Sequence, residues 1–154
     1  MNSKQKKYNR LIHQLEPLLK NSPSLNAQLA TINALLYHKV PYIFWVGFYF
    51  IKNDELIVGP YQGPLACQVL TKPKGVCWAS VLKSEPIIVA DVEDFPDHIA
   101  CDSRSKSEIV IPVKDTSGKV VGVLDIDSDK TEQFDRDDLA GLSGILNLIN
   151  KKFL

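Results

Sequence analysis

The chain has 154 residues, of which 45% are hydrophobic and 23% charged, the proportions of a soluble globular protein. Eighteen lysines and arginines balance eighteen aspartates and glutamates, so no excess of positive charge is available to hold a nucleic acid. No apolar run is long enough for a membrane span, and the opening MNSKQKKYNRLIHQLEPLLK lacks the uninterrupted apolar segment of a signal peptide. The length predicts one domain, residues 1–154, and the cytoplasm is the default location.

Two stretches near the start and one near the end have the periodicity of amphipathic helices. In residues 8–19 apolar side chains recur at helical spacing, although Pro17 predicts a kink or an end to the helix there. The segment NSPSLNAQLATINALLYHK predicts a second helix, capped by Ser24. Its apolar stripe consists of Leu25, Leu29, Ile32 and Leu36. Asp135 is the expected cap of a last helix. The buried face of that helix is predicted to hold Leu139, Leu142, Ile145 and Ile149.

The middle of the chain predicts strands. The segments that are rich in β-branched and aromatic residues are YIFWVGFYFI, ELIVGPY, EPIIVADV, SEIVIPV and KVVGVLDID. DTSGK is a predicted hairpin turn between the last two. Strands joined by short turns favour an antiparallel sheet, and helices at both ends favour the α+β class. Residues 60–105 have little regular pattern, so we expect long loops there, and loops often carry function.

The three cysteines Cys67, Cys77 and Cys101 allow several interpretations. No pair has C-x-x-C spacing, so a thioredoxin-type motif is absent, and a metal cage completed by His98 has no spacing signature. Burial as small hydrophobic residues and a redox role are both open for Cys67 and Cys77. Cys101 differs because its small and polar neighbours suit an exposed loop. In that loop the His98 side chain would help to ionise the Cys101 thiol if the two groups faced each other, although a solvated histidine is the simpler interpretation.

Three acidic residues are predicted to share one face of the sheet. Asp125 and Asp127 are two residues apart in KVVGVLDID, so both point away from the core face that carries Leu124 and Ile126. Glu108 in SEIVIPV likewise points away from its apolar neighbours. Adjacent acids on a strand repel one another, so a solvated face is one interpretation. A covered pocket is the other, in which the acids bind an ammonium group or share a proton.

Aromatic residues alternate along FWVGFYF. Trp45 and Tyr49 lie on one face of the predicted strand, with Gly47 between them. The opposite face, expected to be core, consists of Phe44, Val46, Phe48 and Phe50. The first face is either ordinary core or an apolar wall for a small ligand, which Gly47 would allow to approach closely.

Phosphate-binding loops, a G-x-S-x-G elbow and an H-E-x-x-H motif are absent, which excludes the easily recognised nucleotide, hydrolase and metalloprotease classes. Five other segments, WVGFYF, GPYQGPLAC, GVC, DFPDHIACDSRSKSEIVIPV and GKVVGVLDIDS, resemble the free methionine-(R)-sulfoxide reductase family, whose members are single GAF domains. The resemblance runs over about residues 24–150, and HIACDSxSxSEIVxP with GVLDIDS is its most specific part. It implies a GAF-like α+β fold: a central antiparallel sheet of about five to six strands, terminal helices on one face and a pocket on the other.

The resemblance also implies roles for the cysteines. Cys101 matches the nucleophile, and Cys67 and Cys77 match the family's other two cysteines. One of them would resolve the sulfenic acid; we expect Cys67, while the sequence leaves Cys77 open. Trp78 departs from the family, many of whose members have glycine there, and it predicts altered packing around Cys77.

The resemblance further implies that Glu108, Asp125 and Asp127 bind the substrate and that Trp45 and Tyr49 form the aromatic side of its pocket. A cysteine thiolate attacks the sulfoxide sulfur, an acid protonates the oxygen, and a sulfenic acid then condenses to a disulfide. Thioredoxin is the expected reductant, with no metal, no cofactor and a possible homodimer. A non-enzymatic GAF module that binds a small ligand or senses oxidants is the alternative, and turnover distinguishes the two.

Overall fold

Six strands form one antiparallel sheet in the order β3-β2-β1-β6-β5-β4. The computed structural model describes all 154 residues. Its strands are β1 Trp45–Lys52, β2 Glu55–Gln62, β3 Val69–Leu70, β4 Ile87–Val89, β5 Ser107–Lys114 and β6 Val120–Ser128. Its helices are α1 Ser3–Lys20, α2 Leu25–Lys39, α3 Gly75–Lys83 and α4 Arg136–Leu146, with short 3₁₀ turns at η1 Val92–Asp94 and η2 Lys151–Phe153.

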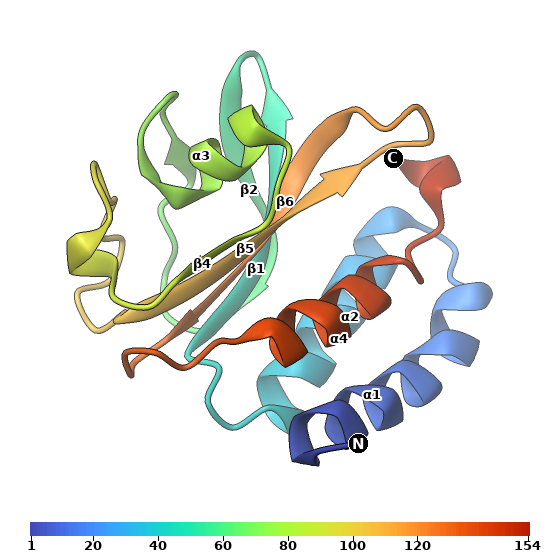
Figure 1. The fold of residues 1–154 in the computed structure, drawn as a ribbon. Helices are drawn as coiled ribbons and strands as arrows, with labels where there is room; N and C mark the ends of the chain where they lie inside the picture. The colour runs from blue at the N-terminus through green and yellow to red at the C-terminus, as the bar shows by residue number, and fades with distance from the viewer.

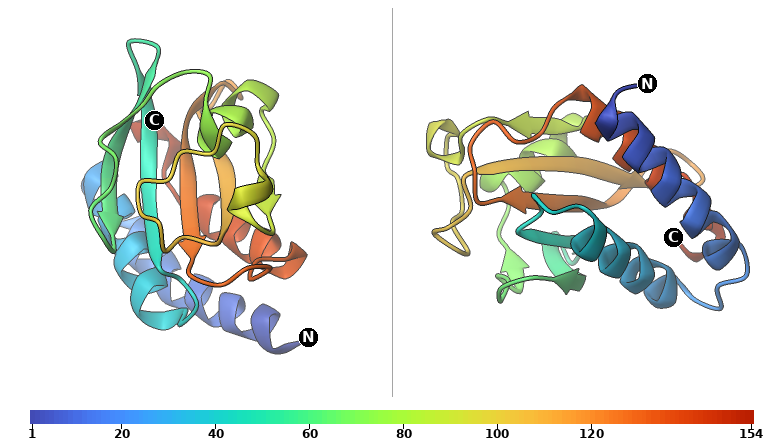
Figure 2. Two further views of the ribbon diagram at one scale, coloured as in Figure 1. Left: turned by 90° about the vertical axis from the view of Figure 1, so that its left-hand side faces the viewer. Right: turned by 90° about the horizontal axis from the view of Figure 1, so that it is seen from below.

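Helices α1, α2 and α4 lie on one side of the sheet, and α3 lies on the other (Figure 1). The two further views show the same layers, with the segment between α3 and β5 on the side away from the terminal helices (Figure 2). The predicted α+β class is therefore confirmed, as is the expected central antiparallel sheet with the terminal helices on one face. No helix combines the length and the apolar character that crossing a membrane would require.

The predicted helix caps are present. The Ser24 side chain accepts a hydrogen bond from the backbone of Ala27 at the start of α2. The Asp135 side chain caps α4, and the Asp138 carboxylate accepts a hydrogen bond from the Asp135 backbone N–H, which completes a capping box. These caps satisfy backbone N–H groups that have no partner inside the helix, so they fix where each helix begins.

Pro17 does not end α1, which continues to Lys20. The last turn of the helix is retained because Leu19 is buried in the core and its carbonyl accepts a hydrogen bond from the Gln28 side chain. These tertiary contacts compensate for the backbone hydrogen bond that proline cannot donate. Leu18, on the outer side of this turn, is 55% exposed.

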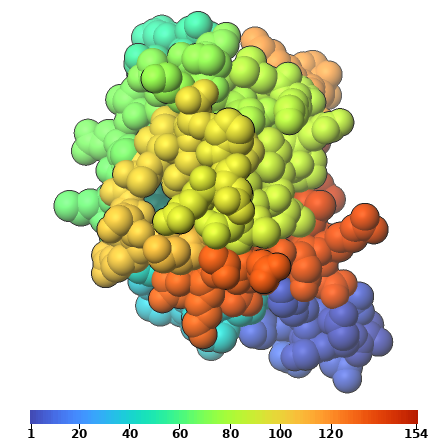
Figure 3. Space-filling model, turned by 60° about the vertical axis from the view of Figure 1, so that its left-hand side comes forward, coloured from blue at the N-terminus to red at the C-terminus, as the bar shows by residue number.

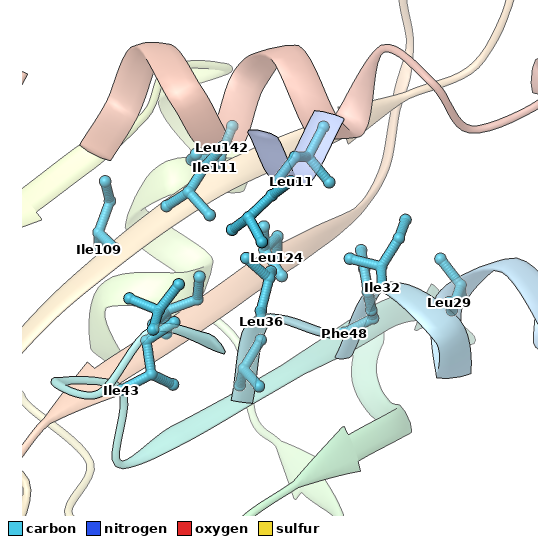
Figure 4. Packing of buried hydrophobic residues seen from close by; sticks show 14 of the residues in the cluster. Leu11, Leu29, Ile32, Leu36, Ile43, Phe48, Ile109, Ile111, Leu124 and Leu142 are labelled. Atoms are coloured by element: carbon cyan, nitrogen blue, oxygen red, sulfur yellow. The ribbon is translucent and has the colours of Figure 1, made fainter. Parts of the chain in front are cut away.

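The sheet face toward α1, α2 and α4 is mainly apolar, with the buried pair Ser107 and Ser128 at one end. Alternate residues of three adjacent strands, such as Phe48, Leu124 and Ile109, point into this core, as their spacing predicts. Figure 4 shows these side chains together with Leu36 of α2 and Leu142 of α4. Burial of this apolar surface is the main source of stability, and it leaves the opposite face of the same strands free for other residues.

The segment between residues 60 and 105 is more regular than its sequence suggests. It contains β3, helix α3 and the short strand β4. Only β4 had a clear signal in the sequence. The Trp78 ring is buried in α3, and its indole N–H donates to the Leu70 carbonyl at 2.7 Å. Trp78 thus fixes α3 against β3 and does not line the pocket described below.

Candidate active site

A pocket opens on the face of the sheet that α1, α2 and α4 leave uncovered. About 600 Å³ of empty space, part of it open to solvent, lies between β1, β5, β6, α3 and two loops. In Figure 3 a narrow opening is visible among the yellow and gold atoms, which belong to the region around residue 100. The lining residues are Phe44, Trp45, Tyr49, Leu65, Ala66, Leu70, Lys74, Gly75, Val76, Cys77, His98, Ile99, Ala100, Cys101, Asp102, Ser105, Glu108, Asp125 and Asp127.

Strand register brings the three predicted acids together on the floor of this pocket. Asp127 of β6 pairs with Glu108 of β5 on one side and with Trp45 of β1 on the other. Asp125 lies two residues along β6, opposite Gly47 and Val110. Side chains of directly paired residues are close neighbours on one face of a sheet. The prediction that the three acids share a face is confirmed, and that face is a covered pocket.

The pKa of each of the three carboxyl groups is raised. Burial, followed by the charge of Asp127, raises the pKa of Glu108 to about 8. Burial is also the main cause for Asp125 and Asp127, with Glu108 adding to the shift at Asp125 and Asp125 adding to it at Asp127. Closely spaced acids in a dry site hold protons that they would release in water. The floor of the pocket therefore keeps a proton on Glu108 at neutral pH.

Cys77 belongs to this acidic cluster. Its side chain is buried, and burial together with the charge of Asp125 raises the pKa of its thiol. Cys77, Glu108 and Asp125 each contribute one atom to a cluster whose members lie within 4.8 Å of one another, a spacing that one small cation can span. The Oδ1 atom of Asp125 is buried without a hydrogen-bond partner. An unsatisfied buried carboxyl oxygen marks this spot as a place for a donor group of a ligand.

Cys67 and Cys101 form a disulfide at the rim of the pocket. Their Cα atoms are 5.4 Å apart although 34 residues separate them in the chain. Cys101 is exposed and Cys67 is partly buried, while Cys77 keeps a free, buried thiol. The cage of three cysteines and His98 considered from the sequence is therefore not formed, because two of the sulfur atoms are bonded to each other.

The loop that carries Cys101 is held by charged contacts. The Asp102 carboxylate accepts hydrogen bonds from the backbone and the guanidinium of Arg104, and these bonds lower the pKa of Asp102 to about 2. The Arg104 guanidinium lies 4.9 Å from the centre of the Phe44 ring. His98 lines the pocket, with Nε2 at 3.7 Å from Glu108 Oε2, and burial lowers its pKa. His98 therefore contacts the acidic cluster, and at neutral pH it is uncharged.

The predicted aromatic wall is present. The rings of Trp45 and Tyr49 stack with centroids 6.0 Å apart, and Tyr61 stacks on the other side of Trp45 at 5.4 Å. Gly47 does not leave space for a ligand as proposed from the sequence. A Cβ atom there would lie 2.4 Å from the Trp45 ring, so the missing side chain makes room for that ring. Phe44, expected in the core, precedes β1 and lines the pocket.

Several lining residues had no usable signal in the sequence. Leu65, Ile99 and Ser105 lie in loops whose paths depend on the disulfide and on contacts with β1. His98 was considered as a partner of the thiol, and its proximity to Glu108 follows only from the folded position of the loop. Loops of this length have no periodicity that reports which way a side chain points.

Comparison with known proteins agrees with this architecture and places the chain in a protein class. Residues 41–150 match the GAF domain family, and the chain belongs to it. It is 44% identical over 149 residues to GAF domain-containing protein A of Dictyostelium discoideum, covering 96% of this chain and 93% of the relative.

One further relative and one solved structure identify the family within the GAF domain class. The chain is 39% identical over 134 residues to the free methionine-R-sulfoxide reductase of Escherichia coli, covering 87% of this chain and 81% of the relative. The X-ray structure of free methionine-R-sulfoxide reductase from Neisseria meningitidis in complex with its substrate superposes with a TM-score of 0.92 at 38% identity, covering 99% of this chain and 92% of that one. The chain belongs to the free methionine-R-sulfoxide reductase family, whose members are oxidoreductases.

Proposed function

We propose that this protein reduces free L-methionine-R-sulfoxide to L-methionine. The observation that carries the proposal is the disulfide between Cys67 and Cys101 at the rim of a pocket whose floor holds three acids, of which Glu108 and Asp125 are buried and Asp127 is partly buried. A thiol pair supplies two electrons, and an acidic floor suits a small cationic group. A small zwitterion that carries an oxidised sulfur matches both features, as the relatives' activity suggests.

The carboxyl groups of Asp125 and Asp127 would bind the α-ammonium group of the substrate, and Glu108 would keep its proton for the chemical step. The buried, unpartnered Oδ1 of Asp125 supplies an acceptor for it. An ammonium group at this position stabilises the ionised forms of Asp125 and Asp127, so its binding lowers the pKa values of these two carboxyls again. Methionine within a peptide lacks this ammonium group, which gives a physical reason for preferring the free amino acid.

The aromatic wall would hold the other end of the substrate. Trp45 and Tyr49, together with Phe44 before β1, line the pocket with apolar ring surface. A sulfur atom and its methyl group pack favourably against aromatic rings. The sulfoxide sulfur would then face the rim of the pocket, where Cys101 lies.

The first chemical step is oxygen transfer to Cys101. Its thiolate attacks the sulfoxide sulfur, and we assign protonation of the oxygen to Glu108, which holds a proton near neutral pH because its pKa is about 8. The protonated oxygen then moves from the substrate sulfur to the Cys101 sulfur, and the transient sulfur–sulfur bond formed by the attack breaks. Methionine leaves, Glu108 is left as a carboxylate, and Cys101 carries a sulfenic acid. The Cys101 thiolate has given up two electrons, and the substrate sulfur has gained them.

The second step closes the disulfide. The Cys67 thiol condenses with the sulfenic acid of Cys101, forming the sulfur–sulfur bond and one water molecule. Cys67 is favoured over Cys77 because Cys77 is buried on the pocket floor with a raised pKa. An external dithiol, for which thioredoxin is our proposal, would restore both thiols by exchange in a reducing compartment such as the cytoplasm.

A single-turnover experiment with two serine variants tests the proposal. Reduced protein without external reductant is mixed with free methionine-R-sulfoxide, and methionine and peptide-mapped disulfides are measured. We expect one methionine per wild-type chain with a Cys67–Cys101 disulfide, no methionine from Cys101→Ser, and one methionine with a dimedone-trappable sulfenic acid from Cys67→Ser. Methionine release by Cys101→Ser would overturn the assignment of Cys101.

A further inference from the structure

Two aromatic side chains of the pocket wall hold the loop that carries Cys67. The Trp45 indole N–H donates to the Pro64 carbonyl at 3.0 Å, and the Tyr49 hydroxyl donates to the Cys67 carbonyl at 2.8 Å. Backbone pairing resumes only at the next residue, where the Gln68 carbonyl accepts from Val58. No other hydrogen bond is made to the backbone of residues 63–67. The position of this loop therefore depends on these two side chains.

We propose that Tyr49 is a positioning residue for the disulfide-forming step, holding Cys67 where its sulfur reaches Cys101. This inference rests on the proposed function for its catalytic meaning, although the contact itself does not. The Tyr49 ring lines the pocket, whereas its hydroxyl is directed at the Cys67 backbone. One residue thus joins the pocket wall to the cysteine that resolves the intermediate.

The tolerance for loop movement is small. Disulfide formation needs Cα atoms within about 7 Å, and those of Cys67 and Cys101 are 5.4 Å apart. A displacement of the Cys67 loop by roughly 2 Å away from Cys101 would therefore prevent bonding. The Tyr49 hydrogen bond attaches directly to the residue whose position matters, and Tyr49 itself is only 2% exposed. A buried anchor of this kind varies little in position.

The opposite half of the disulfide is held separately. Cys101 lies in the loop that Asp102 and Arg104 fix, with Arg104 placed over Phe44. None of these contacts involves the hydroxyl of Tyr49. Removing that hydroxyl therefore loosens Cys67 and leaves the Cys101 loop as it is. The expected consequence is a slower reaction of Cys67–SH with Cys101–SOH to give the disulfide and water.

The equilibrium test uses Tyr49→Phe, with Tyr61→Phe as the matched control. Tyr61 belongs to the same aromatic stack, but its hydroxyl makes no hydrogen bond. The oxidised proteins are equilibrated in glutathione redox buffers, and the fraction of Cys67–Cys101 disulfide is measured by thiol alkylation. We expect the equilibrium constant for disulfide formation to fall roughly tenfold in Tyr49→Phe, the loss expected for one buried hydrogen bond, and to stay near the wild-type value in Tyr61→Phe.

The kinetic test follows the sulfenic acid. Reduced proteins are oxidised with one equivalent of hydrogen peroxide, and dimedone traps the Cys101 sulfenic acid at successive times. We expect a sulfenic acid that lasts several-fold longer in Tyr49→Phe, and also in Trp45→Phe, which removes the second anchor. Wild-type lifetimes and equilibrium constants in both variants would overturn the proposal. Neither test uses methionine sulfoxide, so a wild-type protein that fails to release methionine would count against the proposed function alone.

Discussion

The two faces of the central sheet are built from the same strands and differ in almost every physical respect. Toward α1, α2 and α4, the side chains of β1, β5 and β6 are mainly aliphatic or aromatic, and most of them are buried. Toward the pocket, the same strands carry Glu108, Asp125 and Asp127, whose burial raises their pKa values. One face stabilises the fold, and the other holds three acids in an environment that disfavours their charge.

The contrast is sharpest between the one buried acid on the helix side and the three acids of the pocket. Asp138, on the helix side, accepts hydrogen bonds from Lys4, Tyr8 and Tyr42, so its charge is compensated. The pocket acids have no lysine or arginine partner, and Asp125 has an oxygen with no partner at all. The fold can therefore satisfy a buried acid where it serves stability. We infer that the uncompensated cluster is kept for a ligand that brings its own positive charge.

The largest expected effect comes from Glu108→Gln, which should separate function from stability. Removal of the proton donor should lower kcat/KM for methionine-R-sulfoxide by about 10³-fold, within the range for loss of a general acid. Asp138→Asn is the control, another buried acid but on the helix side; it should lower the free energy of unfolding and leave kcat/KM of the folded protein near the wild-type value. Equal kcat/KM in Glu108→Gln and wild type would remove Glu108 from the chemistry.

On the helix face we expect the opposite result, a loss of stability with activity retained. Leu124 is fully buried in the core directly beside Asp125 in sequence. Leu124→Ala should lower the free energy of unfolding by about 3 to 5 kcal/mol through lost burial and a residual cavity, while the folded protein retains its activity. Urea denaturation measures the change, with Leu82→Ala as control because Leu82 is 55% exposed. A large loss of kcat with little loss of stability would contradict the division between the faces.

The pH dependence of stability should distinguish wild type from Glu108→Gln. The pKa of Glu108 is about 8 in the folded protein and near its ordinary value of 4.5 when unfolded. The folded state therefore binds an extra proton between these values, and wild-type stability falls as pH rises through this window. Glutamine has no such proton, so the variant should gain about 2 to 4 kcal/mol relative to wild type between pH 5 and pH 9. If urea denaturation gave the two proteins parallel curves of stability against pH, the pKa of Glu108 would not be raised in the folded protein.

A smaller effect is expected at Gly47, on the pocket face of β1. The new methyl group of Gly47→Ala would lie 2.4 Å from the Trp45 ring and 2.5 Å from Tyr61 Cβ, so both must move. We expect a loss of about 1 to 3 kcal/mol of stability and a higher KM because the ring that it displaces lines the pocket. Gly59→Ala, where the nearest atom is 3.3 Å away, should cost less. Thermal unfolding compares the two, and an unchanged KM in Gly47→Ala would argue against the role of Trp45.

Much of the difference between the faces could be predicted from the sequence. A period of two in KVVGVLDID places Asp125 and Asp127 opposite Leu124 and Ile126, and the structure confirms this arrangement. The caps at Ser24 and Asp135 were likewise predictable from local hydrogen-bonding chemistry. Such features depend on residues close together in the chain, so a single sequence contains the information for them.

Features that depend on distant segments could not be predicted in the same way. Helix α3 was missed because it is only nine residues long and lies in a stretch without clear periodicity. Of the kink or end expected at Pro17, the end was wrong because contacts of Leu19 retain the last turn of α1. The pairing of Cys67 with Cys101 was favoured by resemblance alone, and the anchor from Tyr49 had no signal, because loop paths decide both.

The most direct test of the account measures wild-type turnover of two substrates in the presence of thioredoxin, thioredoxin reductase and NADPH. Free L-methionine-R-sulfoxide carries the ammonium group that the pocket acids would bind, and N-acetyl-L-methionine-R-sulfoxide lacks it. We predict sustained NADPH oxidation with the free amino acid and a kcat/KM at least about 100-fold lower with the acetylated one, as expected when buried polar groups lose their partner. No methionine formed from the free sulfoxide, or equal rates on the two substrates, would contradict the account.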